Sequence, residues 1–183
     1  MKVYLDTGIF IDYLSKQAIA GSTLRSANRR GRTPQKLFED AENVLKAIAA
    51  SHRGATSCLT YYEVEEALFK QLASAAAGMP NASKMRVIAA RSIVPQTFTA
   101  MRFFDIQALD LTAAIVSAQL DSMELLMKGI RAADALHIAT AIHFDAEVLI
   151  SVDDDLLRLN GAIKNQSGVV LKFCDTDEAL SLL

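Results

Sequence analysis

The sequence predicts a three-layer α/β fold, with a central, mostly parallel sheet of about five strands flanked by helices. Short apolar runs of strand length alternate with segments of helical periodicity along the chain, and this order is typical of β–α–β units. The 183 residues are 51% apolar, which is enough for a sizeable core. Because no internal repeat or low-complexity linker interrupts the pattern, we expect one domain over residues 1–183.

The first quarter of the chain predicts one strand and two helices. Val3–Leu5 has the character of a buried strand, and a short helix follows over 9–14. The stretch 20–34, AGSTLRSANRRGRTP, holds two glycines, a proline and four arginines, so we expect an exposed loop or a mobile helix there. Apolar residues at helical spacing then predict a helix over 35–50.

The middle of the chain predicts a second strand and a helical region. A run rich in Thr, Tyr and Leu predicts a strand over Ala55–Tyr62. An Ala-rich helix follows over 64–77, and a further helix begins at Ser83. Pro95 is expected to end or kink that second helix, and 97–104 adds a further turn or two.

The last part of the chain alternates strands and helices again. Thr112 is a candidate cap for a helix that extends to Met127, with Gly129 beyond its end. The remaining elements are predicted from apolar runs and periodicity. They are strands over Ile106–Leu111, Glu147–Val152 and Val169–Phe173, a buried helix over Ala133–Phe144, and a short helix from Asp175.

Four acids stand at the ends of these elements: Asp6, Glu63, Asp134 and Asp153. Three of them come directly after predicted strands, whereas Asp134 begins a helix that leads into the next strand. The carboxyl ends of parallel strands share one edge of a sheet, and helix N-termini favour carboxylates. We therefore expect the four acids to converge at this edge.

Converged carboxylates repel one another unless a cation lies between them. Mg²⁺, with Mn²⁺ as a substitute, prefers carboxylate and water oxygens. A carboxylate-held ion lowers the pKa of bound water and neutralises charge on a phosphoryl oxygen, which favours phosphodiester hydrolysis. No Ser–His–Asp or Cys–His arrangement offers another nucleophile.

Neighbouring acids leave alternatives open. Glu65 and Glu66 compete with Glu63, but their spacing also fits a solvated helix face, and Glu63 is the first acid after the predicted strand. Asp155 is expected to act as an auxiliary acid of the site, and Asp154 to be a bystander. His137 lies one turn after Asp134, where a packed, hydrogen-bonded histidine is favoured over a metal ligand or a general base.

Charge and cysteine usage limit the classes of function. The formal net charge of −2 excludes a whole-molecule basic field, so any nucleic-acid contact must use a local patch. The four arginines of the predicted loop either contact RNA phosphates or are simply solvated; they are Arg25, Arg29, Arg30 and Arg32. Cys58 and Cys174 are expected to be reduced thiols, and the lack of a signal peptide or membrane span predicts a cytoplasmic protein.

The acid-bearing segments resemble those of PIN-domain ribonucleases, and most of all the VapC-type toxins of bacterial toxin–antitoxin pairs. The resemblance rests on YLDTGIFIDYL, TSCLTYYEVEEAL and AADALHIATAIHFDAEVLISVDDDL, which follow the family's order over nearly the full chain. The matching metal-binding acids are Asp6, Glu63, Asp134 and Asp153, with Asp155 as a supplementary acid of the metal site. Thr7 and Ser151 match small hydroxyl residues beside the site.

Two features depart from the family pattern. Gly8 stands where the family often has Asn or Ser, and this is expected to loosen a hydrogen bond behind the acids. The stretch Lys16–Arg32 is longer than the usual first connection.

The resemblance implies a Mg²⁺- or Mn²⁺-dependent endoribonuclease that hydrolyses RNA phosphodiester bonds. It further implies the toxin component of a type II toxin–antitoxin system, a homodimer inhibited by a cognate antitoxin protein. One alternative is a PIN fold that binds RNA or protein without cutting. Another is a Mg²⁺-dependent phosphatase, but aspartyl-nucleophile phosphatases require a second Asp where this chain has Gly8.

Overall fold

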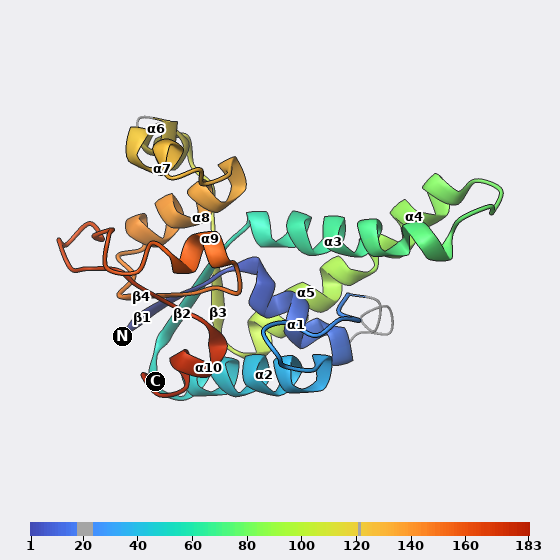
Figure 1. Ribbon diagram of the computed structural model, residues 1–183, viewed down its shortest axis with the longest axis horizontal. Coiled ribbons are helices and arrows are strands. Elements are labelled where there is room, and N and C mark those ends of the chain that lie inside the picture. The colour runs from blue at the N-terminus through green and yellow to red at the C-terminus, as the bar shows by residue number, and fades with distance from the viewer. Residues whose placement is uncertain (18–23, 121) are drawn as a thin grey trace.

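The computed structural model describes residues 1–17, 24–120 and 122–183, and contains one five-stranded sheet (Figure 1). The strand order is β3-β2-β1-β4-β5, and every neighbouring pair is parallel. The strands are β1 (Lys2–Leu5), β2 (Arg53–Ser57), β3 (Ile106–Leu109), β4 (Val148–Ile150) and β5 (Lys172–Cys174). The predicted α/β fold with a parallel central sheet is confirmed.

Helices cover both faces of this sheet. They are α1 (Thr7–Gln17), α2 (Pro34–Ser51), α3 (Leu59–Ala75), α4 (Ala82–Arg91), α5 (Ile93–Phe103), α6 (Ala113–Leu120), α7 (Met123–Met127), α8 (Ala132–His143), α9 (Asp154–Leu157) and α10 (Thr176–Ala179). In Figure 1, α1, α2 and α10 lie on one side of the strands, and α8 and α9 lie on the other. Within the described residues, no helix combines the length and apolar character needed to cross a membrane.

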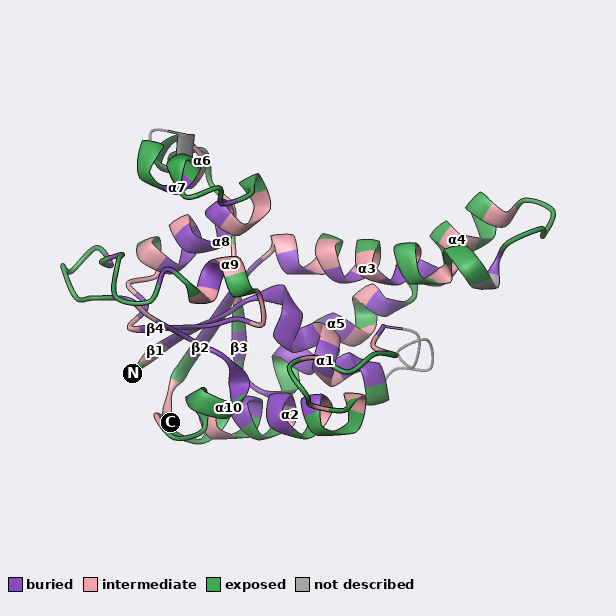
Figure 2. Ribbon diagram, in the orientation of Figure 1, coloured by how far each residue is buried: buried purple, intermediate pink, exposed green. Residues whose placement is uncertain are grey.

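Alternation along the strands divides the core into two parts. Val3 and Leu5 of β1 belong to the core shared with α1, α2, α3 and α5, whereas Tyr4 belongs to the core beneath α8. In β4, Ile150 and Leu149 are divided between the two cores in the same way. Figure 2 shows these central strands buried, as expected of a parallel sheet covered on both faces.

The second strand is shorter than predicted, which is a correction. It ends at Ser57, and α3 begins at Leu59, so Thr60 to Tyr62 are helical rather than extended. The Ser57 hydroxyl accepts a hydrogen bond from the Leu59 backbone N–H at 3.2 Å, and this local turn starts the helix. The strand propensity of Thr and Tyr is overridden by this turn.

Three other boundaries differ from the prediction. The helical region breaks at Ser92, between α4 and α5, so the break expected at Pro95 falls three residues earlier and Pro95 itself lies in the first turn of α5. The helix predicted from Thr112 to Met127 is described as α6 and α7, and residue 121 between them lies outside the described residues. Val169 and Val170 are exposed, and β5 begins only at Lys172.

Candidate active site

Asp6 and Asp153 lie just beyond the carboxyl ends of β1 and β4, two neighbouring strands. The Asp6 backbone N–H donates to the Ile150 carbonyl at 3.0 Å, which extends the ladder to the sheet edge. Ser151 joins the two acids, because its hydroxyl donates to Asp6 Oδ2 at 2.7 Å and accepts from the Asp153 N–H at 3.0 Å. The strand-end argument for these two residues is therefore confirmed.

Both carboxylates are also oriented by nearby backbone groups. Asp6 Oδ1 accepts a hydrogen bond from the Thr7 N–H at 2.8 Å. Asp153 caps α9, where its Oδ1 accepts from the Asp155 N–H at 2.7 Å. These contacts fix the rotamers of the acids and leave lone pairs on each for a further ligand.

Helix α8 brings Asp134 and His137 opposite β1. Asp134 lies in the first turn of α8, as predicted, and His137 is three residues further on and shares its face. Tyr4 of β1 and Asp6, which directly follows the strand, are two residues apart and also share a face. The His137 Nε2 atom lies 3.9 Å from Asp6 Oδ1. The face of α8 that carries Asp134 and His137 is therefore turned toward the end of β1.

Glu63 reaches the same place from α3. It was expected directly after a strand, but it is the fifth residue of a helix, so its predicted local setting was wrong. Its Oε2 accepts hydrogen bonds from His137 Nε2 at 2.7 Å and from the Thr7 hydroxyl. The side chain is held inward by these two contacts rather than by the end of the sheet.

The pKa shifts show that the four acids act on one another. Burial and the charges of Asp6, Asp153 and Glu63 raise the pKa of Asp134 to about 6. Burial also raises the pKa of Asp6, against the opposing effects of the His137 charge and the Ser151 hydrogen bond. Asp134 is therefore within electrostatic reach of the other three acids, and Asp6 is within reach of Glu63.

Among the described residues, His137 is the basic side chain in contact with this cluster. Burial would lower the pKa of His137, but its hydrogen bond to Glu63 and the nearby carboxylate charges raise it overall. For Glu63 the balance is the reverse, because the His137 hydrogen bond and charge outweigh burial and lower its pKa. Within the described chain, no lysine or arginine forms an ion pair with any of the four acids.

The donor chemistry of this cluster fits a hard divalent cation. All four groups are carboxylates, burial raises the pKa of Asp6 and of Asp134, and the charges of neighbouring acids add to both shifts. Across residues 1–17, 24–120 and 122–183, however, no three His, Cys, Asp or Glu side chains are arranged so that they could hold a metal ion as they stand. Glu63 is bonded to His137 instead, so metal binding requires the carboxylates to adjust.

The neighbouring acids are engaged elsewhere. Glu65 pairs with Arg91 at 2.8 Å and Glu66 with Lys70 at 2.8 Å, in keeping with an outer helix face. Asp155 contributes its N–H to Asp153, while its carboxylate accepts from Arg158 at 2.5 Å.

The four arginines of the predicted loop form ion pairs, and the expectation of a solvated loop is wrong for them. Arg29 and Arg32 are joined by two backbone hydrogen bonds around a turn in which Arg30 and Gly31 both have positive φ, as in a type I′ turn. We call residues 24–33 the arginine hairpin; residues 20–23 of the predicted loop lie outside the described residues. Its guanidinium groups pair with Asp12, Asp40, Asp154 and Asp175.

Gly8 lies against the residue that precedes Asp153. A Cβ atom at position 8 would stand 2.1 Å from the Cγ2 atom of Val152, which is far inside van der Waals contact. Val152 therefore occupies the space that a side chain at position 8 would need. The glycine allows α1 to approach the end of β4 closely.

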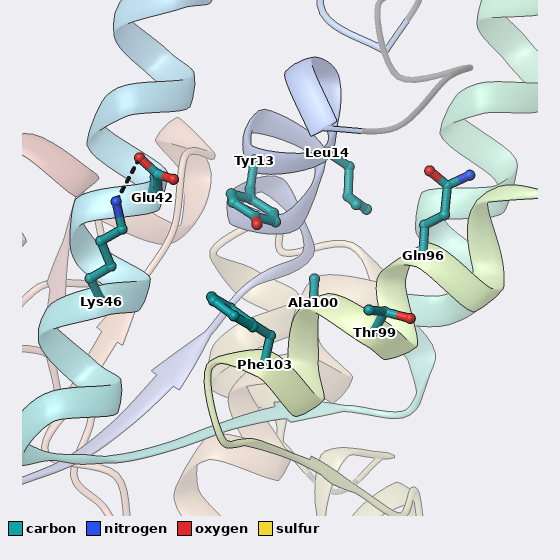
Figure 3. A pocket seen from close by; sticks show the side chains of 8 residues that line it. All are labelled: Tyr13, Leu14, Glu42, Lys46, Gln96, Thr99, Ala100 and Phe103. Carbon is teal, nitrogen blue, oxygen red and sulfur yellow. Dashed lines mark ion pairs between the residues drawn. The ribbon is translucent and has the colours of Figure 1, made fainter.

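A separate cavity of about 510 Å³ lies between α1, α2 and α5 (Figure 3). Tyr13 and Phe103 form apolar walls, and the Glu42–Lys46 ion pair stands at one side. None of the four clustered acids lines this cavity. It is thus distinct from the acid cluster.

A fully parallel sheet with acids gathered beyond its carboxyl edge is a typical setting for phosphate chemistry. The family model described as PIN domain matches residues 34–162, which is more than half of the chain. The chain therefore belongs to the PIN-domain family, whose members are generally nucleases, and a nuclease-type hydrolytic function follows. No curated protein and no solved structure gives a significant match.

The matched range includes Glu63, Asp134 and Asp153 but begins after Asp6. Asp6 joins the site through the structure, because β1 lies at the centre of the sheet next to β4. Sequence reasoning did not anticipate the contact between His137 and Glu63. The one available signal was the spacing of His137 one helical turn after Asp134.

Proposed function

We propose that this protein is a Mg²⁺- or Mn²⁺-dependent endoribonuclease and the toxin of a type II toxin–antitoxin pair, with residues 1–183 forming a single nuclease domain. The observation that carries the proposal is the gathering of four carboxylates in a PIN-domain protein, where burial and the charges of Asp6, Asp153 and Glu63 raise the pKa of Asp134 to about 6. The resemblance of the acid-bearing segments to VapC-type toxins supports RNA as the substrate.

In this proposal Asp6, Glu63, Asp134 and Asp153 would hold the cation, and Asp155 would support them. When bound, the cation supplies Lewis acidity, lowering the pKa of water and neutralising charge on the scissile phosphate.

The remaining groups of the site orient these acids. Ser151 holds Asp6 and Asp153 in register, and Thr7 holds both Asp6 and Glu63. Placing the acids in advance lowers the cost of assembling the charged site.

The proposed partners are RNA, a second copy of the chain and a cognate antitoxin protein. Large apolar side chains are exposed on α4 and α5, among them Ile88 at 65% and Phe103 at 75%. Burial of such residues favours association with another protein, which supports the homodimer and antitoxin parts of the proposal.

Cleavage of total RNA with Mg²⁺ or Mn²⁺ tests the proposal, with the cut sites mapped. Asp134→Asn and Glu63→Gln remove ligand charge with little change of shape, and we expect each to lower the cleavage rate by about 10³-fold. Glu66→Gln is the matched control, because Glu66 is on the same helix and pairs with Lys70 on the surface. It should cut at the wild-type rate.

Asp134→Asn cutting RNA at the wild-type rate with Mg²⁺ would contradict the mechanism. A wild-type protein that neither binds Mn²⁺ nor cuts any RNA would instead support a PIN fold that binds without cutting. Turnover of a small phosphomonoester in place of RNA would support a phosphatase.

A further inference from the structure

Three buried or half-buried polar side chains form a continuous hydrogen-bonded series from β1 to α3. The Tyr4 hydroxyl lies 2.7 Å from His137 Nδ1, and His137 Nε2 lies 2.7 Å from Glu63 Oε2. Tyr4 and His137 have no exposed surface, and the Glu63 side chain is 23% exposed. The series therefore begins inside the core and ends at the acid cluster.

The direction of one hydrogen bond in this series follows from chemistry. A carboxylate only accepts, so His137 Nε2 must carry the hydrogen that binds Glu63. The other ring nitrogen, Nδ1, lies 2.7 Å from the Tyr4 hydroxyl, from which it accepts when the imidazole is neutral and to which it donates when the imidazole is protonated.

Tyr4 holds the imidazole in a single orientation. The two rings meet edge to face at 67°, with centroids 5.9 Å apart, and Tyr4 is among the largest fully buried side chains. Because Tyr4 lies in the central strand and His137 on the helix packed above it, neither side chain has room to turn away.

The three glutamates of α3 show how the hydrogen bond from His137 affects the direction of a glutamate side chain. Glu65 and Glu66 on the same helix make ion pairs with basic residues of the surface. Glu63 is bonded inward, by His137 and by the Thr7 hydroxyl. A helical glutamate has three side-chain torsions to restrict, so its place in the cluster depends on such contacts.

We infer that His137, held by Tyr4, is a positioning residue that orients the Glu63 carboxylate toward Asp6 and Asp134. His137 acts through Glu63 and needs no contact with RNA or with a cation. The consequence for cation affinity rests on the proposed function, whereas the orientation of Glu63 does not.

Two substitutions at His137 separate this role from packing. In His137→Gln the amide nitrogen takes the place of Nε2 and still donates to Glu63. In His137→Asn the amide nitrogen takes the place of Nδ1 and loses Glu63. Titration calorimetry with Mn²⁺ should show His137→Gln within about threefold of wild type and His137→Asn weaker by about 10–100-fold. Tyr4→Phe should fall between them.

Thr97→Val provides a control for destabilisation alone. Thr97 is fully buried in α5 and its hydroxyl bonds the Ile93 carbonyl at 3.0 Å, away from the acids. Urea unfolding should show it destabilised like the His137 variants, with Mn²⁺ affinity unchanged. If His137→Asn binds Mn²⁺ as tightly as wild type, or His137→Gln loses as much affinity as His137→Asn, the inference is overturned.

Ring ¹⁵N spectra of His137 test the orientation without a metal. The inference expects a protonated, hydrogen-bonded Nε2 whose resonance moves in Glu63→Gln and stays in place in Glu66→Gln. A resonance that ignores Glu63→Gln overturns it. If wild type binds no Mn²⁺, the proposed function fails, while the ring spectrum still decides whether His137 positions Glu63.

Discussion

Two groups of acids in this molecule differ in the basic side chains that contact them. Around the arginine hairpin, the buried carboxylates of Asp12, Asp40 and Asp175 are each paired with arginine, for example Asp12 with Arg29 at 2.7 Å. At the sheet edge, four carboxylates are gathered and His137 is the basic side chain in contact with them among the described residues.

The pKa shifts record this difference. Burial would raise the pKa of Asp175, but the hydrogen bond from Thr176 and the charges of Arg32 and Arg29 lower it overall. The pKa of Asp134 moves the other way, to about 6. The chain neutralises the buried acids around the hairpin with its own arginines, whereas the proposed function assigns this role at the sheet edge to an external cation.

Asp175→Asn should have the largest effect on stability. Asn still caps α10, but Arg30 and Arg32 lose the buried negative charge that they face. We expect a loss of about 3 kcal/mol at pH 7 in urea unfolding. Because the folded pKa of Asp175 is lowered, the loss should shrink as the pH falls below about 4. An equal loss at pH 3 and pH 7 would contradict the assigned role of these ion pairs.

Asp134→Asn should stabilise the protein in the absence of divalent metal. The folded pKa of about 6 lies above the usual 3.8, so the folded state binds more protons and wild-type stability falls as the pH rises between these values. After allowance for solvent screening, the gain for the variant should reach about 1–2 kcal/mol above pH 6 and vanish near pH 4. Thermal unfolding in EDTA measures it; a variant less stable than wild type at pH 7.5 would refute the repulsion argument.

Mn²⁺ affinity should weaken as the pH falls below about 6. Below this value Asp134 holds a proton that the cation must displace, so the affinity should fall by up to about tenfold per pH unit. Calorimetry between pH 5 and pH 8 tests this. An affinity that is constant across this range would show that Asp134 does not bind the cation.

Arg30→Gln should have the smallest effect. One partner of Arg30, Asp154, is 76% exposed, and the other, Asp175, keeps Arg32. We expect a loss below about 1 kcal/mol and an unchanged KM for RNA. A KM raised severalfold at unchanged stability would instead make Arg30 an RNA contact, which was one of the two sequence-based alternatives.

The fold was predictable because its signals are local. Buried strands such as Val3–Leu5 and Val148–Ile150 are short apolar runs, and the acids that follow β1 and β4 stand beside them in the sequence. The contacts that were not predicted join distant positions. Arg30 and Asp175 are 145 residues apart, and Glu63 and His137 are 74 apart. Neither spacing leaves a periodic pattern, so only tertiary structure reveals these pairs.

Val152 and Gly8 have a consequence for how this sequence can vary. The space that a side chain at position 8 would need is occupied by a methyl group of Val152. The two positions are therefore epistatic: a larger residue at position 8 becomes acceptable only when position 152 loses bulk. In a combinatorial library selected for folding, serine or asparagine at position 8 should be recovered together with alanine or glycine at position 152, and rarely with valine.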